Sequence, residues 1–472
     1  MFDRLIRFSA RLEPLAIAVS SGTEHLNYRD FDRVIDKVAS ALARCGVGAP
    51  ALVGVSIRDT YRHLLIVLGC ARLGVATVSL VPDAAEAMRR VANVSIMLGD
   101  ASAMEPDLLI DTEWLADAIS AEHRPVGLPA IDPKALSRVE LSSGTIGELG
   151  PVGLSWALMD RRIEHSWMRT FGYERLLCLI GPESGSLPVY LACWARGGCV
   201  LFGSSDPHIL ARSLPTLRPT GMLVAPAQLA LVLDALPEEA APLAGLHVAI
   251  AGERASAALY QRATLRLGTV NVIYGSIEAG VCANAFSASL KGEGSVGWVT
   301  PWTAIEVVDE NDRPRPASMS GRIRVRGPDV VDGDFGLAGK VSERFRDGWF
   351  YPGDIGALTV DGMLSIKGRE DEIMYVGGQR FLPQALENPV LRVPGVIDAA
   401  AFAVADSDGN QQPWLAIVRD ADLKEEAIGQ ALALPDLPPV RIAWIDVIPR
   451  TALGKARRDA LKEAARGLVS QA

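Results

Sequence analysis

The stretch that decides this fold is a run of small and hydroxyl-bearing residues, Leu141-Ser142-Ser143-Gly144-Thr145-Ile146-Gly147. A tight loop of this composition can turn backbone N–H groups and side-chain hydroxyls toward phosphate oxygens. It is not a Walker-type phosphate loop, because no Gly-Lys-Ser or Gly-Lys-Thr follows it. Taken by itself, the run is more typical of a plain surface turn, so its meaning depends on the segments around it.

On both sides of this run, apolar segments of strand type alternate with segments of helical periodicity. The sequence predicts helices over 30–45, 61–72, 187–196 and 209–214, and strands over 51–57, 74–80, 175–180, 199–202 and 221–225. This alternation indicates parallel sheets that are covered by helices. Ligands of such folds bind at the carboxyl ends of the strands.

The pattern changes after about residue 294 and again after residue 368. Short strands are predicted over 305–309, 321–325 and 363–366, followed by a compact mixed unit with strands over 373–376, 399–404 and 414–418 and a helix over 383–391. The short strands, which are joined by turns, indicate a small β-rich region. We therefore predict an α/β fold whose large N-terminal domain, 1–367, holds helix-covered sheets and a small β-rich subdomain. A boundary segment, 368–371, then leads to a small α+β C-terminal domain, 372–472.

Composition and charge narrow the class of protein. Of the 472 residues, 49% are hydrophobic and 22% are charged, which is ordinary for a globular chain. The formal net charge of −9 argues against a general nucleic-acid binder, since such proteins usually carry a basic surplus. The most apolar stretch, 63–82, contains an arginine and two glycines, so we interpret it as a buried helix and strand and expect no membrane span. Six cysteines without a Cys-x-x-Cys pair, and an N-terminus without a secretory signal, predict buried free thiols and a cytoplasmic protein.

Two further motifs could bind a nucleotide. The first is Tyr274-Gly275-Ser276-Ile277-Glu278, in which Tyr274 could stack on a base and Glu278 could help to hold Mg²⁺ near phosphates. The second is Trp349-Phe350-Tyr351-Pro352-Gly353-Asp354, in which an aspartate after a Pro-Gly turn could accept hydrogen bonds from ribose hydroxyls. Each is also consistent with an ordinary strand end or turn.

Two more motifs lie toward the C-terminus. Gly368-Arg369-Glu370-Asp371 coincides with the predicted domain boundary, and Pro449-Arg450-Thr451-Ala452-Leu453-Gly454-Lys455 places one lysine on a glycine-containing loop. A mobile ammonium is useful where negative charge develops during phosphoryl or adenylyl transfer. Because several basic residues follow Lys455, a solvated basic tail is the alternative interpretation.

Together the five motifs, in this order and approximate spacing, resemble the adenylate-forming superfamily of acyl- and aryl-CoA synthetases, nonribosomal-peptide adenylation domains and luciferases. The resemblance covers nearly the whole chain and includes 26–31, 294–297 and 321–327. It implies activation of a small carboxylic acid with ATP and Mg²⁺, formation of an acyl-adenylate, release of pyrophosphate and transfer of the acyl group to a thiol. CoA is the expected thiol, and the phosphopantetheine of a carrier protein is the alternative.

The resemblance also implies roles for individual residues. Those that match the ATP or AMP site are Ser142, Ser143, Gly144, Thr145, Gly147, Gly252, Glu253, Arg254, Tyr274, Gly275, Asp354 and Arg369. Lys455, Glu278 and Thr145 match the catalytic groups, and Glu278 is also the expected Mg²⁺ ligand. Asp371 matches the hinge about which a mobile C-terminal domain carrying Lys455 would rotate.

Some positions depart from the family pattern. The usual phosphate loop reads Ser-Ser-Gly-Thr-Thr-Gly-x-Pro-Lys, whereas this chain has Ile146, Leu149 and Gly150 at three of these positions and Ile277 in place of another threonine. Each lost hydrogen bond to a charged group costs about 1.5–3 kcal/mol. A nucleotide-binding relative with impaired catalysis therefore stays open as an alternative to a CoA ligase. The other alternative, an adenylating ligase that loads only a carrier protein, stays open because the thiol acceptor is not known from the sequence. The segments 179–191 and 250–254 are candidates for the acid pocket, but they do not identify the acid.

Overall fold

The computed structural model describes two compact units. The first contains Met1–Lys291, Val296–Ile305 and Val325–Phe350, and the second contains Gly292–Ser295, Glu306–Arg324 and Tyr351–Ala472. The structure describes residues 3–469 except 104, 128, 144–148, 170–171, 238–242, 244, 291–293, 332–341, 377–378, 406–410, 421–422, 434–438 and 451–455. This division does not test the predicted boundary at 368–371, which stays a prediction.

A long sheet forms the centre of the first unit. Its strands there run in the order β15 (Ser295–Val299), β14 (Gly280–Phe286), β13 (Thr269–Ser276), β12 (His247–Ile250), β11 (Gly221–Val224), β9 (Arg175–Cys178), β10 (Cys199–Leu201), β1 (Ile17–Ser20), β2 (His25–Asn27). From β13 to β1 all neighbours are parallel, whereas β2, β14 and β15 are antiparallel to theirs. The predicted parallel, helix-connected arrangement is therefore present.

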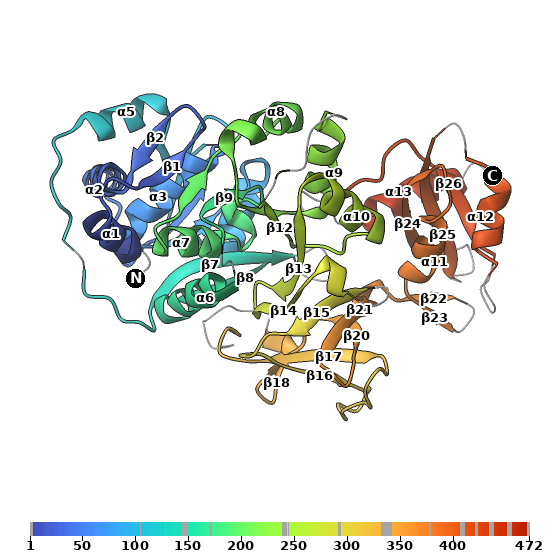
Figure 1. Ribbon diagram of the computed structural model, residues 1–472. Helices are drawn as coiled ribbons and strands as arrows, with labels where there is room; N and C mark the ends of the chain where they lie inside the picture. The colour runs from blue at the N-terminus through green and yellow to red at the C-terminus, as the bar shows by residue number, and fades with distance from the viewer. Residues whose placement is uncertain are drawn as a thin grey trace. The chain divides into compact units, whose positions relative to one another are not determined.

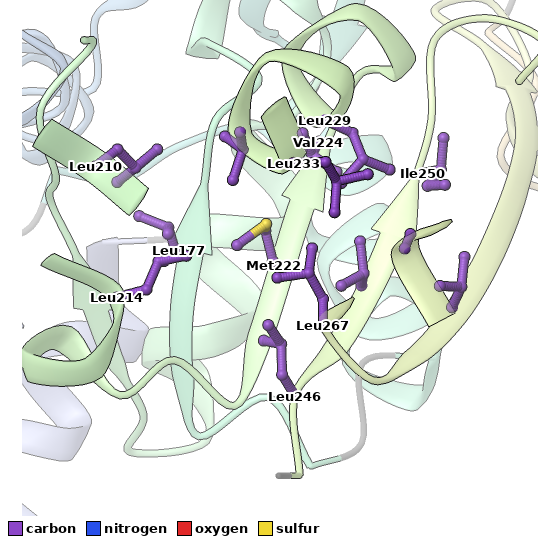
Figure 2. Close-up of a cluster of buried hydrophobic side chains, with 14 of the residues drawn as sticks. Leu177, Leu210, Leu214, Met222, Val224, Leu229, Leu233, Leu246, Ile250 and Leu267 are labelled. Atoms are coloured by element: carbon purple, nitrogen blue, oxygen red, sulfur yellow. The ribbon is translucent and has the colours of Figure 1, made fainter. Parts of the chain in front are cut away.

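Three helices cover one face of the parallel strands, namely α8 (Pro207–Leu217), α9 (Pro226–Ala235) and α10 (Ala257–Arg266) (Figure 1). Their apolar stripes pack on alternate strand residues and form one buried cluster. Figure 2 shows Leu214 of α8 and Leu233 of α9 close to Met222 of β11 in this cluster. Burial of this surface fixes the strands, and with them the positions of the loops at their carboxyl ends.

A second sheet in the same unit runs β6 (Leu108–Leu109), β5 (Ile96–Gly99), β3 (Leu52–Ser56), β4 (Ala76–Ser79), β7 (Leu136–Ser143), β8 (Leu149–Ser155). In this sheet β7 and β8 are antiparallel to each other, and all other neighbouring strands are parallel. The helices of the first unit that precede, connect or follow these strands are α1 (Asp3–Leu12), α2 (Tyr28–Arg44), α3 (Thr60–Arg72), α4 (Ala85–Ala92), α5 (Thr112–Ser120), α6 (Trp156–Arg169) and α7 (Leu187–Ala195). The guanidinium of Arg72 joins α3 to α2, because it lies 2.9 Å from Asp36 and 2.7 Å from Asp32.

The second unit contains β20 (Asp354–Leu358), which pairs with β17 (Gly321–Arg326) and β21 (Met363–Arg369). After β21 follow β22 (Met374–Val376), β23 (Gln379–Phe381), α11 (Gln384–Val390), β24 (Val396–Ala405), β25 (Gln411–Arg419), α12 (Glu425–Ala431), β26 (Arg441–Trp444) and α13 (Arg458–Val469). Alternate residues of β24 face two different cores, so that α11 and α12 cover one face of the sheet and α13 covers the other (Figure 1).

Most predicted elements are confirmed with shifts of a few residues at their ends. The helix predicted over 30–45 is α2, and the strand predicted over 221–225 is β11. The prediction that the cysteines are buried holds for four of the six, because Cys45 is exposed and Cys178 is half-buried. Within the described part of the chain, no helix is both long and apolar enough to cross a bilayer.

Candidate active site

Two groups of predicted nucleotide residues lie at one edge of the parallel sheet. Gly252, Glu253 and Arg254 follow β12, and Tyr274 lies near the end of β13, its parallel neighbour. The backbone at Gly252 has φ of +96°, a left-handed conformation that favours glycine. Because carboxyl ends of parallel strands meet at the same edge, this turn and Tyr274 lie at one edge of the sheet, and their role in binding adenine stays a prediction.

The chain at Gly275 requires glycine. A Cβ atom there would lie 2.2 Å from the carbonyl oxygen of Gly280, and the register of β13 against β14 shifts at this point. The close approach of the two strands leads directly into a tight turn, in which the hydroxyl of Ser276 accepts a hydrogen bond of 3.2 Å from the N–H of Ala279. Glu278 lies in this turn and is buried, with 3% of its surface exposed.

The main chain of Glu278 is held from two sides. Its carbonyl oxygen accepts hydrogen bonds from the N–H of Val331 at 2.8 Å and from Nη2 of Arg162 at 3.3 Å. Arg162 also donates to the carbonyl of Asp329 at 2.7 Å. Burial lowers the pKa of Arg162, and the nearby carboxylates of Glu140, Asp329 and Glu278 act in the opposite direction. The carboxylate of Glu278 is thus positioned by a fixed backbone, with Nη1 of Arg344 at 3.9 Å from its Oε1.

A histidine–aspartate pair beside this turn was not found by sequence reasoning. Nδ1 of His165 lies 2.7 Å from Oδ2 of Asp329, and the imidazole stacks on Trp302 with ring centres 4.1 Å apart. Asp329 follows the Gly321–Gly327 motif by two residues, but nothing in its local pattern marks it as buried. The pair joins α6 to the segment around Asp329, and Val331 of that segment donates to the carbonyl oxygen of Glu278.

The predicted phosphate-loop residues are only partly described. Ser142 and Ser143 end β7, where their backbones pair with those of Gly150 and Leu149 of β8. Gly144, Thr145 and Gly147 lie outside the described residues.

Strand β7 carries a buried ion pair just before these residues. Nε of Arg138 lies 3.2 Å from Glu140, and its Nη2 donates to Ser79 at 2.7 Å and to the carbonyl of Pro182 at 2.6 Å. A Cβ atom at Gly185 would lie 3.3 Å from Oε2 of Glu140. The strand that leads to the phosphate loop is therefore tied to the 182–185 loop, part of the candidate acid pocket.

In the second unit, Asp354 and Arg369 face each other across β20 and β21. Nη1 of Arg369 lies 3.1 Å from Oδ1 of Asp354, and its Nε lies 3.0 Å from Oδ1 of Asp371. Burial alone would lower the pKa of Arg369, but the facing carboxylates of Asp354 and Asp371 outweigh it and raise that pKa. The predicted ribose residue, its arginine and the predicted hinge residue thus form one ionic group.

The residues before and after Lys455 frame the lysine, which itself lies outside the described residues. Arg450 and Ala456 form an antiparallel bridge, and Arg450 is ion-paired with Asp398 at 2.7 Å. Arg450 and Ala456, the described residues nearest to Lys455 on its two sides, therefore lie side by side in the second unit.

The donor set suits a cation that arrives with a phosphate ligand. Among the described residues, no group of three or more His, Cys, Asp or Glu side chains could hold a metal ion. Mg²⁺ typically takes one or two protein carboxylates and completes its shell with phosphate oxygens and water. Glu278 as a single buried carboxylate fits that mode of binding.

The comparison with protein families decides the identity of this fold. The sequence model of the family described as "AMP-binding enzyme" matches residues 6–333. The chain belongs to the AMP-binding enzyme family. This match confirms the predicted family. Together with the relatives and solved structures described next, it confirms the predicted fold class and the predicted kind of enzyme, an acid–thiol ligase that forms an acyl-adenylate.

Curated relatives of this AMP-binding enzyme match over almost its whole length. It is 24% identical to an indoleacetate–CoA ligase of Aromatoleum aromaticum, over 96% of each chain. It is 25% identical to a fatty acid–[acyl-carrier-protein] ligase of Mycobacterium marinum, over 98% of this chain and 97% of that protein. A probable non-canonical nonribosomal peptide synthetase of Salinispora arenicola is 28% identical over 96% of this chain, which spans 6% of that protein.

Among solved structures, the chain is similar to an O-succinylbenzoate coenzyme A synthetase of Bacillus subtilis in complex with ATP and a magnesium ion. The TM-score is 0.83 at 19% identity, with 97% of this chain and 99% of that chain covered. This likeness shows the fold.

Proposed function

We propose that this chain activates a carboxylic acid with MgATP and transfers the acyl group to the thiol of CoA. The observation that carries the proposal is the ionic group of Asp354, Arg369 and Asp371, because it joins the residues assigned to ribose binding and to the hinge. The indoleacetate–CoA ligase supports CoA as the thiol and makes aromatic acids the first class to test.

In the first unit, we assign the adenine to Tyr274, Gly275 and the turn Gly252-Glu253-Arg254. We assign the phosphates to Ser142, Ser143, Gly144, Thr145 and Gly147. Glu278 would hold Mg²⁺, which supplies positive charge beside the phosphates when it is bound. The placement of Tyr274 and Gly252 at one sheet edge, and the burial of Glu278, support these assignments.

In the second unit, we assign the ribose hydroxyls to the carboxylate of Asp354, with Arg369 holding that carboxylate in place. Lys455 would bind the acid's carboxylate and the α-phosphate, where negative charge grows as the acyl-adenylate forms. Rotation about Asp371 would then remove Lys455 and allow the thiol to attack, so that one site runs two half-reactions.

A carrier protein is the second candidate for the thiol, and the fatty acid–[acyl-carrier-protein] ligase supports it. Free CoA and a phosphopantetheinylated carrier protein can be offered separately to the purified enzyme with the same acid. Thioester formed on CoA supports the first proposal, whereas thioester formed only on the carrier supports the second.

The cytoplasmic location of the protein stays a prediction.

Pyrophosphate release tests the first half-reaction. The full chain is given ATP, Mg²⁺ and pools of aromatic, fatty and amino acids, and the wild type is compared with Lys455→Ala. We expect acid-dependent release that Lys455→Ala abolishes. ATP binding without release from any pool would favour a relative with impaired catalysis.

A further inference from the structure

Arg344 lies beside Glu278 in the first unit and is not among the residues assigned to ATP or to the acid. It ends the 3₁₀ turn Ser342–Arg344 and directly precedes β18 (Phe345–Arg346), which pairs with β19 (Trp349–Phe350). The rings of Phe345 and Phe350 pack with their centres 5.0 Å apart. The hairpin therefore fixes the backbone next to Arg344, while the side chain keeps several rotatable bonds.

The contact of Arg344 with Glu278 is a charge contact rather than a hydrogen bond. Its Nη1 lies 3.9 Å from Oε1 of Glu278, which is too long for a hydrogen bond. The side chain of Arg344 is 21% exposed, whereas that of Glu278 is 4% exposed. Arg344 makes no hydrogen bond with any residue that the structure describes, so the N–H donors of its guanidinium remain for a ligand.

The neighbouring segments supply little positive charge to a phosphate. Residues 139–150, which contain the predicted phosphate loop, include no lysine or arginine, and they carry Glu140 and Glu148. Arg162 is buried and uses its donors on the carbonyls of Glu278 and Asp329. Arg344, in contrast, is partly exposed, and a guanidinium matches phosphate oxygens through two parallel hydrogen bonds.

We propose that Arg344 is a phosphate-binding residue that holds the pyrophosphate group of ATP and of the leaving product. The inference rests on the proposed function. In the adenylation step, an oxygen of the acid's carboxylate forms a bond to the α-phosphorus. The bond from that phosphorus to the bridging oxygen breaks, and its electron pair leaves with pyrophosphate. Arg344 lies where it can offset the charge that gathers on this leaving group, since Glu278 is the carboxylate assigned to the accompanying Mg²⁺.

Calorimetric binding of magnesium pyrophosphate to the full chain tests this directly. We expect Arg344→Gln to weaken binding about 10- to 100-fold, as for the loss of one hydrogen-bonded charge, and Arg344→Lys to weaken it less. Arg346→Gln removes the same charge from an exposed position two residues away and should bind as the wild type does. In pyrophosphate exchange, Arg344→Gln should raise the KM for pyrophosphate and leave the KM for the acid unchanged.

Two outcomes would overturn the inference. Pyrophosphate could bind Arg344→Gln as tightly as the wild type, or more tightly, which would show that Arg344 only shields Glu278. The wild type could also fail to bind pyrophosphate at all. If binding depends on Arg344 but no acid supports exchange, the proposed function fails while the phosphate site stands.

Discussion

Nη1 of Arg458 lies 2.9 Å from Oε1 of Glu372, so the first residue of α13 is ion-paired with the residue that follows Asp371. The same guanidinium binds Glu387 of α11 at 2.7 Å and the carbonyl of Ala401 at 2.9 Å. Arg458 follows Lys455 by three residues. The residue after the predicted hinge is thus joined to the start of α13, and we expect these parts to move together.

Replacing Arg458 should destabilise the second unit. Arg458→Met leaves Glu372 and Glu387 without their cation in a mostly buried place, which should cost about 3 kcal/mol in free energy of unfolding. Urea unfolding measures this. Arg457→Met is the matched control, because its partner Asp459 is exposed and the expected change is within about 0.5 kcal/mol. Equal losses in the free energy of unfolding for Arg458→Met and Arg457→Met would contradict the stabilising role of the Arg458 ion pairs.

The hinge assignment predicts a split between the two half-reactions. Asp371→Pro restricts the backbone and should spare pyrophosphate exchange while thioester formation falls by at least about tenfold. Asp371→Ala removes the carboxylate near Arg369 without fixing the backbone, so it separates loss of charge from loss of rotation. If Asp371→Pro lowers both half-reactions equally, Asp371 is not the hinge.

Asp354→Asn should weaken ATP binding roughly 10- to 100-fold, because a neutral amide accepts hydrogen bonds from ribose more weakly than a carboxylate does. Calorimetry with ATP measures the change, and the melting temperature shows whether the fold is kept. Asp361→Asn, in the turn between β20 and β21, should leave ATP binding unchanged. Unaltered affinity in Asp354→Asn would remove Asp354 from the ribose site.

His63 predicts a loss of stability in acid. Burial, together with the charge of Arg138, lowers the pKa of His63 to about 3, against about 6.5 in the unfolded chain. Between pH 3 and pH 6.5 the unfolded chain binds a proton at His63 that the folded protein does not bind. The contribution of His63 to the free energy of unfolding is therefore complete above pH 6.5 and is lost as the pH falls toward 3. From pH 7 to pH 5 this single group should cost about 2 kcal/mol.

The matched variant for this effect is His63→Gln. Nε2 of His63 lies 2.7 Å from Oγ of Ser79, and an amide can keep a hydrogen bond there without titrating. Urea unfolding at pH 7 and pH 5 should therefore show a smaller acid effect in the variant than in the wild type. The same slope in both proteins would mean that other groups account for the acid sensitivity.

The sequence predicted the parts of this fold that depend on local patterns. Apolar periodicity and turn residues located β11, α2 and α7 to within a few residues, and the spacing of five motifs led to the family. Gly275 was recognised as part of a motif, but the reason for it, the approach of Gly280, depends on a strand pairing that no local pattern encodes.

Long-range partners were the part that sequence could not supply. Asp329 meets His165 across 164 positions of the chain, and Arg138 meets Ser79 across 59. The contact of Arg344 with Glu278 is also long-range, because it forms only when β18 and β19 have folded beside the end of β13. Charged residues of this kind look like ordinary surface residues until their burial and their partners are known.

Acyl-adenylate formation is tested most directly with an acid whose carboxylate carries ¹⁸O. The full chain turns over this acid with ATP, Mg²⁺ and CoA, and mass spectrometry of the nucleotide product follows the label. Attack of the carboxylate on the α-phosphorus predicts AMP that contains one ¹⁸O atom from the acid. Unlabelled AMP, or ADP as the product, would contradict activation through an acyl-adenylate.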